Sequence, residues 1–252
     1  MSELGVMSPT GDREGARRLD AVSFAHVNYS WPGSSPFTLT IPRFVLQRGE
    51  KLLLLGPSGS GKSTFLSLLA GIVVPDEGRV AIDNTDMAKL GGAARDRFRV
   101  DHFGIIFQMF NLLPYASLID NVLLPVRFSR LRRENALREG PLDDVAKRLL
   151  LDLGLDATVI ASSTAASLSV GQQQRVAAAR ALIGAPQIIV ADEPTSALDR
   201  STEGAFLKLL FAQSEKADTS VIMVSHDEGL GRHFDRVVRL QDIAVSTRGG
   251  RS

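Results

Sequence analysis

The chain has 252 residues, of which 44% are hydrophobic and 23% charged, a composition that supplies ample apolar surface for a globular core. Its 29 basic and 28 acidic residues leave a net charge of +1, so the overall charge gives no reason to expect a nucleic-acid partner. The absence of cysteine excludes disulfides, thiolate catalysis and zinc sites built on cysteine.

The first residues differ in composition from the rest of the chain. Residues 1–18 combine acidic side chains with Gly and Pro and contain no apolar stretch of signal-peptide length. We therefore expect a flexible tail over 1–18 and a single domain over 19–252. No run in the sequence approaches the roughly 18 apolar residues that a membrane-spanning helix needs, so any membrane role must come through a partner.

Strands and helices alternate along most of the chain. The patterns predict strands over 21–29, 37–46, 51–55, 78–82 and 103–108, with a helix from the end of the third strand to about residue 70. Between about 110 and 168 the pattern changes to helices, predicted over 117–124, 130–138 and 142–153. Alternation then resumes with a helix over 172–183, a strand over 187–191, a helix over 202–213 and strands over 220–225 and 236–240. This order predicts an α/β fold with an inserted helical subdomain.

A glycine-rich segment follows the all-apolar strand at 51–55. It fits the pattern G-x-x-x-x-G-K-[ST], in which backbone N–H groups turn inward around phosphates and the next helix directs its positive end at the same anion. In this pattern Lys62 reaches the β- and γ-phosphates of a nucleotide and the hydroxyl of Ser63 binds Mg²⁺. The alternative is a glycine-rich turn with no ligand. The residues expected to hold the nucleotide are Gly56, Pro57, Ser58, Gly59, Ser60, Gly61, Lys62, Ser63 and Thr64.

Two carboxylates end the apolar strand at 187–191. Ligands of open α/β sheets lie beyond the carboxyl ends of the strands, so Asp192 and Glu193 are expected beside the phosphates. Asp192 would hold Mg²⁺, and Glu193 would orient or deprotonate the attacking water. Taken alone, two acids after a strand more often mark the start of a loop.

The segment Ser-Leu-Ser-Val-Gly-Gln-Gln-Gln-Arg at 167–175 begins a predicted helix. Ser169 and Gln172 fit a capping box, in which each side chain satisfies a backbone N–H at the helix start. Together with Ala-Asp-Glu-Pro-Thr-Ser-Ala-Leu-Asp at 191–199 and Val-Ser-His-Asp at 224–227, this segment resembles the corresponding motifs of ABC-type ATPases. The resemblance extends from about residue 21 to 240, with the motifs in the family's order.

This resemblance implies a P-loop NTPase core with an N-terminal antiparallel β subdomain, and a head-to-tail dimer that encloses two MgATP. It implies that Ser169, the Gly171 backbone and Gln172 contact ATP held by the second subunit. Val170 stands where the family usually has glycine. Asp199 is expected to bridge the two chains.

Three further residues take their roles from the same resemblance. Gln108 is expected to contact Mg²⁺ or the attacking water, and His226 to contact the γ-phosphate and hold Glu193 in place. Tyr29, 33 residues before Lys62, is expected to stack on adenine, with Trp31 as its rival. Read without the family, Gln108 is an ordinary polar residue at a strand end, and His226 is a surface histidine or a satisfied core histidine.

The segment 107–125 begins at Gln108 and is rich in Met, Phe and Leu. By resemblance it contacts a separate transmembrane permease subunit, and the alternative is local core packing. Its amino-acid sequence is similar to that of the family branch that includes lipoprotein-releasing, macrolide-exporting and cell-division ATPases. An arginine-rich run over 127–138 reads as a solvated helical face or as a contact for membrane headgroups.

The sequence thus predicts the ATP-hydrolysing subunit of an ABC transporter or mechanotransmission complex, peripheral on the cytoplasmic face of the inner membrane, with ATP and Mg²⁺. One alternative is a soluble ABC ATPase that acts on translation or DNA. Another is a module that binds ATP without turnover. Lys62, Asp192, Glu193 and His226 together favour hydrolysis.

Overall fold

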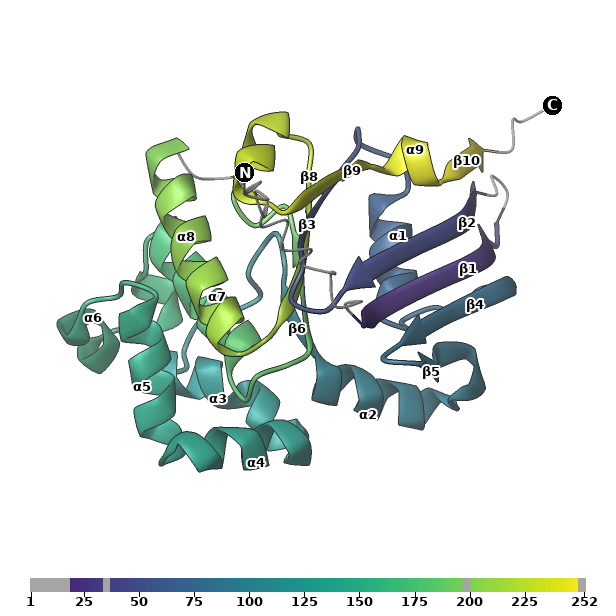
Figure 1. The fold of residues 1–252 in the computed structure, drawn as a ribbon. Coiled ribbons are helices and arrows are strands. Elements are labelled where there is room, and N and C mark those ends of the chain that lie inside the picture. The colour runs from purple at the N-terminus through teal and green to yellow at the C-terminus, as the bar shows by residue number, and fades with distance from the viewer. Residues whose placement is uncertain (1–18, 34–36, 197–199, 249–252) are drawn as a thin grey trace, which may run out of the picture.

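The computed structural model describes residues 19–33, 37–196 and 200–248, so the predicted tail over 1–18 and the residue Asp199 lie outside the described residues. Two five-stranded sheets organise this part of the chain. Figure 1 shows the antiparallel sheet on one side of the molecule, a group of helices on the other, and the parallel sheet between them.

The parallel sheet has the strand order β6-β7-β8-β3-β9. Its strands are β3 (Lys51–Leu55), β6 (Phe103–Ile106), β7 (Ile188–Asp192), β8 (Ser220–Ser225) and β9 (Arg236–Arg239). In β3, Leu53 and Leu55 belong to the core on the helical side, whereas Leu52 and Leu54 belong to the core on the side of the antiparallel sheet. The strand buries both faces because side chains alternate between them, which explains its continuous apolar sequence.

The antiparallel sheet has the strand order β10-β2-β1-β4-β5. Its strands are β1 (Asp20–Trp31), β2 (Phe37–Gln47), β4 (Glu77–Ile82), β5 (Thr85–Asp86) and β10 (Val245–Arg248). An aromatic cluster joins this sheet to the helix that follows β3, since Phe24 and Phe44 both contact Phe65 at ring-centroid separations of 5.1 and 5.0 Å. The cluster fixes that helix between the two sheets.

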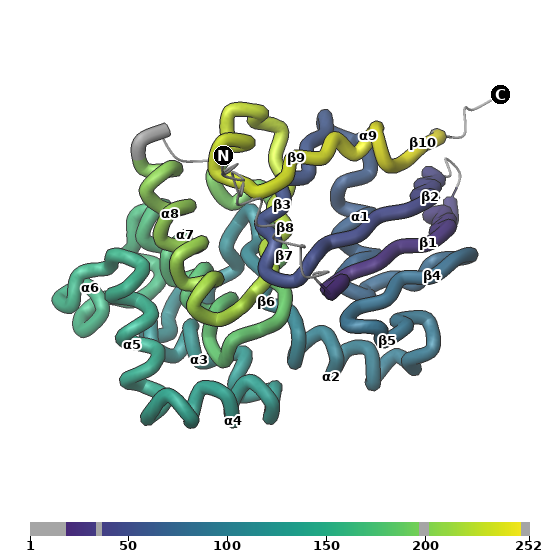
Figure 2. Tube along the Cα trace, in the orientation of Figure 1, coloured from purple at the N-terminus to yellow at the C-terminus, as the bar shows by residue number. Residues whose placement is uncertain are grey.

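The helices are α1 (Lys62–Leu69), α2 (Gly92–His102), α3 (Leu118–Phe128), α4 (Arg130–Glu139), α5 (Leu142–Asp152), α6 (Ala157–Ser162), α7 (Val170–Leu182), α8 (Arg200–Lys216) and the short α9 (Leu240–Ile243). Helices α3 to α6 lie between β6 and α7 in the chain and gather at one end of the molecule, away from the antiparallel sheet (Figure 2). Within the described ranges, no helix combines the length and apolar character needed to cross a membrane.

Several elements differ from the sequence prediction, and three of them show why. Helix α7 begins at Val170, two residues earlier than expected, directly after its cap. Helix α2 was not predicted, because none of its residues is buried and it therefore has no apolar stripe to recognise. Strand β10 was also missed; it pairs with β2, with Val245 opposite Thr40, and so depends on a contact between distant parts of the chain.

Candidate active site

The predicted site residues follow strands that end at one edge of the parallel sheet. In the strand registers, Leu55 lies opposite Ser225, Asp192 opposite Val224, and Ile106 opposite Ala191. The segments that begin at Gly56, Gln108, Glu193 and His226 therefore leave the sheet from the same edge. This arrangement brings residues far apart in the sequence to one place.

The glycine-rich segment forms a tight turn before α1. Gly59 and Gly61 have φ values of +75° and +109°, which side-chain-bearing residues rarely adopt. A Cβ on Gly61 would also stand 2.9 Å from the ring of Phe37. Helix α1 begins after Gly61 without a side-chain cap, so the N–H groups of its first turn are open to an anion.

A cavity of about 620 Å³ lies against this turn. Its lining combines the glycine-rich turn and the start of α1 with residues from four other segments: Trp31, Phe37, Ser58, Gly59, Gly61, Lys62, Ser63, Thr64, Gln108, Asp192 and Glu193. Ser63, Gln108 and Asp192 thus present a hydroxyl, an amide and a carboxylate to one space. Hard oxygen donors of this kind suit Mg²⁺, so the residues present fit the metal expected from the sequence.

Glu193 stands between two other predicted site residues. Its Oε1 lies 3.8 Å from Nζ of Lys62 and its Oε2 lies 3.3 Å from Nδ1 of His226. Nζ of Lys62 also donates to the carbonyl oxygens of Gly56 and Pro57 at 2.7 and 3.0 Å. The three side chains form one connected group, in which Lys62 and Glu193 line the cavity and His226, which does not, contacts Glu193.

The backbone of Glu193 has an unusual conformation. Its φ is +43°, and its N–H donates to the carbonyl of Val224 at 3.0 Å. A left-handed conformation is uncommon for such a residue and persists where the surroundings fix it.

Burial raises the pKa of the adjacent Asp192 carboxyl. The negative charge of Glu193 raises this pKa further, and the positive charge of Lys62 opposes the rise.

The structure places Trp31 rather than Tyr29 at the cavity. Tyr29 is 8% exposed and packs in the core under the antiparallel sheet, whereas Trp31 is 40% exposed and lines the cavity. The two rings meet edge to face at 5.2 Å, and the indole Nε1 of Trp31 donates to Oγ1 of Thr64 at 3.0 Å. The rival residue is therefore the one that the fold brings to the cavity.

The start of α7 has the predicted capping box. Oγ of Ser169 accepts from the Gln172 N–H at 3.4 Å, and Oε1 of Gln172 accepts from the Ser169 N–H at 2.9 Å. Ser169 and Val170 are exposed, and neither they nor Gly171 and Gln172 line the cavity. Within one chain, the structure does not bring this segment to the glycine-rich turn.

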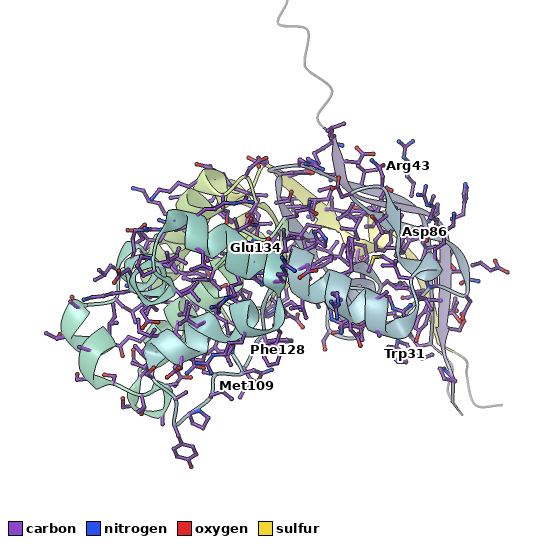
Figure 3. All side chains as sticks on the ribbon, turned by 90° about the horizontal axis from the view of Figure 1, so that it is seen from below. Trp31, Arg43, Asp86, Met109, Phe128 and Glu134 are labelled. Atoms are coloured by element: carbon purple, nitrogen blue, oxygen red, sulfur yellow. The ribbon has the colours of Figure 1, made fainter. Side chains whose placement is uncertain are left out.

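The segment 107–125 is partly core and partly surface. Met109 and Tyr115 are 81% and 91% exposed, and Phe107 and Leu113 are also exposed. Phe110 is only 6% exposed, so within this segment its ring packs in the core and is not available to a partner. Figure 3 shows Met109 on the same face of the molecule as Phe128, which is exposed at the end of α3.

Comparison with known proteins identifies the family and the fold. The model of the ABC transporter family matches residues 39–196. The chain belongs to the ABC transporter family. The predicted ABC ATPase fold is confirmed, and so is the prediction of an ATP-binding and ATP-hydrolysing subunit.

The relatives cover most of this ABC ATPase. The lipoprotein-releasing system ATP-binding protein LolD of Syntrophotalea carbinolica is 35% identical over 228 residues, which span 90% of this chain and 89% of the relative. The ABC transporter ATP-binding protein YbbA of Escherichia coli K12 is 41% identical over 204 residues, which span 80% of this chain and 85% of that one.

Solved structures give the same result. The dimeric structure of the ABC transporter cassette MJ0796, a protein of Methanocaldococcus jannaschii, superposes with a TM-score of 0.72 at 33% identity and covers 86% of this chain and 93% of its own. A second dimeric structure of MJ0796, described as a post-hydrolysis state bound to ADP and Pi, matches equally well.

Sequence reasoning missed one residue that lines the cavity of this ABC ATPase, and it favoured Tyr29 over Trp31, which lines the cavity. Phe37 was predicted only as a strand residue, and nothing in its neighbourhood in the sequence shows that its ring packs against Gly61. Tyr29 and Trp31 lie two residues apart on one strand and so share a face. Only the packing around them decides which ring is buried.

Proposed function

We propose that this ABC ATPase binds MgATP in the 620 Å³ cavity and drives a separate transmembrane permease. The observation that carries the proposal is the group formed by Lys62, Glu193 and His226, which adjoins the Ser63, Gln108 and Asp192 oxygens. A lysine placed to bind phosphate oxygens, a carboxylate base and three hard oxygen donors surround one space. This set of groups suits phosphoryl transfer to water.

The site would orient ATP by holding its phosphates at one end and its adenine at the other. The glycine-rich turn and the first turn of α1 offer N–H groups to the phosphates, and Lys62 adds a positive charge at the β- and γ-phosphates. At the other end we assign adenine stacking to Trp31 in place of Tyr29, because the exposed indole lines the cavity. Ser63, Gln108 and Asp192 would hold Mg²⁺, which neutralises negative charge on the phosphates.

Hydrolysis is assigned to Glu193. Its carboxylate accepts a proton from water as the water oxygen bonds to the γ-phosphorus, and the bond to the bridging oxygen breaks to release ADP and phosphate. His226, 3.3 Å from Glu193, holds the carboxylate in position from one side. Lys62 approaches it from the other side, at 3.8 Å.

A second copy of the chain would complete the site. The exposed capping box at Ser169 lies outside the cavity of its own chain, and the MJ0796 cassettes that resemble this chain are dimers. We propose a head-to-tail homodimer in which Ser169, Gly171 and Gln172 of one copy contact ATP held by the other. The exposed Val170 would then lie at the interface between the copies.

We assign the contact with the membrane partner to the segment 107–125. Its exposed apolar side chains, Met109, Leu113 and Tyr115, follow directly on Gln108, which lines the nucleotide cavity. With this segment on a permease, the protein would lie on the cytoplasmic face of the inner membrane. The relatives named for lipoprotein release support a complex that extracts lipoproteins or transmits force.

Hydrolysis by the purified chain tests the chemistry. Glu193→Gln should lower the rate about 10²–10⁴-fold, because it removes the base but keeps the size of the side chain. Glu228→Gln is the matched control, since Glu228 is an exposed residue near His226 that pairs with Arg239 instead. Equal loss in both variants would refute the assignment of the base.

Co-purification with the membrane protein encoded beside this gene tests the partner surface. Leu113→Glu should abolish co-purification without changing ATP binding. Leu137→Glu places the same charge at an equally exposed leucine on α4 and should have no effect. Normal co-purification of the Leu113 variant would place the contact elsewhere.

A further inference from the structure

Helix α7 carries a buried arginine near its C-terminal end. The guanidinium of Arg180 donates to the carbonyl of Asn111 at 2.7 Å and to the carbonyl of Phe110. Burial lowers the pKa of Arg180. A buried guanidinium that donates to two carbonyls is strongly held. Breaking these hydrogen bonds would leave a buried charge or a carbonyl oxygen unpaired, which would lower the stability of the fold.

The two acceptors of Arg180 belong to an unusual turn. Phe110 and Asn111 are consecutive residues with φ values of +57° and +49°. Left-handed residues other than glycine are uncommon, and a pair of them persists only where surrounding contacts fix the conformation. The buried ring of Phe110 and the guanidinium of Arg180 supply those contacts. The turn begins at Gln108 and includes the exposed Met109.

A second buried side chain of α7 contacts the catalytic turn. Gln174 is 1% exposed, and its Nε2 donates to the carbonyl of Pro194 at 3.0 Å. Pro194 follows Glu193, which also has a left-handed backbone. The N–H of Ser196 closes this turn on the carbonyl of Glu193 at 3.3 Å. One helix therefore holds both the turn that carries Gln108 and the turn that carries Glu193.

The part of α7 between these contacts is rigid. Arg180 lies six positions after Gln174, or about 9 Å along the helix axis. The side chains over Val176–Leu182 are buried on all sides, so a close-packed core surrounds the segment. Its C-terminal end is held by Arg132 of α4, which donates to the carbonyls of Ala181 and Ile183 at 2.7 and 2.6 Å. A segment held in this way is suited to carry a displacement from one contact to the other.

We propose that Arg180 and Gln174 are positioning residues that make α7 a rigid link, within one chain, between the 108–111 turn and the Glu193 turn. Movement of the 108–111 turn displaces α7 through Arg180, and Gln174 passes the displacement to the backbone beside Glu193. The biological use of the link rests on the proposed role of the segment 107–125 as the permease contact. The link itself exists in the chain with or without a partner.

Hydrogen exchange of backbone amides in the full-length chain tests the link directly. The amides of Phe110 and Leu113 report on the first turn, since they donate to the Phe107 carbonyl at 2.9 Å and to Oδ1 of Asn121 at 2.8 Å. Those of Glu193 and Ser196 report on the second turn. Arg180→Met should speed exchange about tenfold or more at both turns, as expected for the loss of the charge-assisted hydrogen bonds to Phe110 and Asn111.

Arg175→Met is the matched control. Arg175 is also an arginine of α7 whose guanidinium donates to a backbone carbonyl, but the acceptor is Gly154, in the loop between α5 and α6. This variant should leave exchange at both turns unchanged. Faster exchange at both turns in Arg175→Met would overturn the proposal, because α7 would then respond to any lost contact. Faster exchange at the first turn alone in Arg180→Met would also overturn it, because Arg180 would then stabilise only its own acceptors.

Arg180→Lys covers the case in which Arg180→Met does not fold. Lysine keeps the charge but cannot donate to both carbonyls in the forked geometry of arginine, so a smaller acceleration at the same two turns is expected. Wild-type exchange at either turn would overturn the proposal. In hydrolysis, Arg180→Lys should lower kcat and leave KM for ATP unchanged, because Arg180 does not line the nucleotide cavity. The exchange result does not require turnover, so failure of the link and failure of the proposed function are separate outcomes.

Discussion

Replacing Trp31 should mainly weaken ATP binding, whereas replacing Tyr29 should mainly lower the stability of the fold. Trp31 is 40% exposed and lines the cavity, so Trp31→Ala removes a surface on which adenine would stack. Stacking of a base on an aromatic side chain is worth about 1–3 kcal/mol, so the Kd for ATP should rise about 5- to 150-fold. The indole also donates to Thr64, and loss of that partly buried bond should cost only about 0.5–1.5 kcal/mol of stability.

Tyr29→Ala should act on stability instead. Tyr29 is 8% exposed in a core cluster, and truncation of a buried aromatic residue costs about 3–5 kcal/mol. For a domain of this size, each kcal/mol lowers Tm by about 2–4 °C. The folded fraction of this variant should bind ATP with nearly wild-type affinity, because the ring does not line the cavity.

Calorimetric titration with MgATP and thermal melting separate the two effects. Trp31 is the only tryptophan in the chain, so a change in its emission on addition of ATP gives an independent reading. Trp31→Tyr keeps an aromatic surface and should restore much of the affinity. Wild-type affinity in Trp31→Ala, together with a large loss in a folded Tyr29→Ala, would refute the reasoning.

Two further predictions concern the catalytic group. Lys62→Ala should weaken ATP binding by about tenfold or more, since it removes a charged donor to the phosphates, and equal calorimetric affinities in wild type and variant would disprove the phosphate role. Asp192→Asn should raise Tm at pH 7.5. The folded-state pKa of Asp192 lies above its unfolded value, so the wild type loses stability as pH rises through that pKa, and the variant does not. The difference in Tm should vanish below about pH 4, where the unfolded carboxyl is protonated too, and a lower Tm for Asp192→Asn at pH 7.5 would contradict the burial argument.

The features that could be predicted are those decided by neighbouring residues. The apolar run at 51–55 and the glycine-rich turn after it predict a buried strand and an open helix start, and both are found. The capping box at Ser169 and Gln172 was also predicted, because four consecutive residues determine it.

The features that could not be predicted depend on contacts between distant residues. Phe110 lies in an apolar-rich segment beside exposed side chains, and its ring is buried because a left-handed turn directs it into the core. The contacts of Arg180 and Gln174 join residues that are 69 and 20 positions apart. Neither contact leaves a signal in the local pattern.

Light scattering of Glu193→Gln with MgATP tests the central claim, that two copies enclose the nucleotide. With hydrolysis blocked the variant should be a dimer. Adding Ser169→Arg should return it to a monomer that still binds ATP, because bulk and charge would then occupy the place of the γ-phosphate held by the second copy. A Glu193→Gln dimer that persists with Ser169→Arg would contradict the account and leave Ser169 only its role in the capping box.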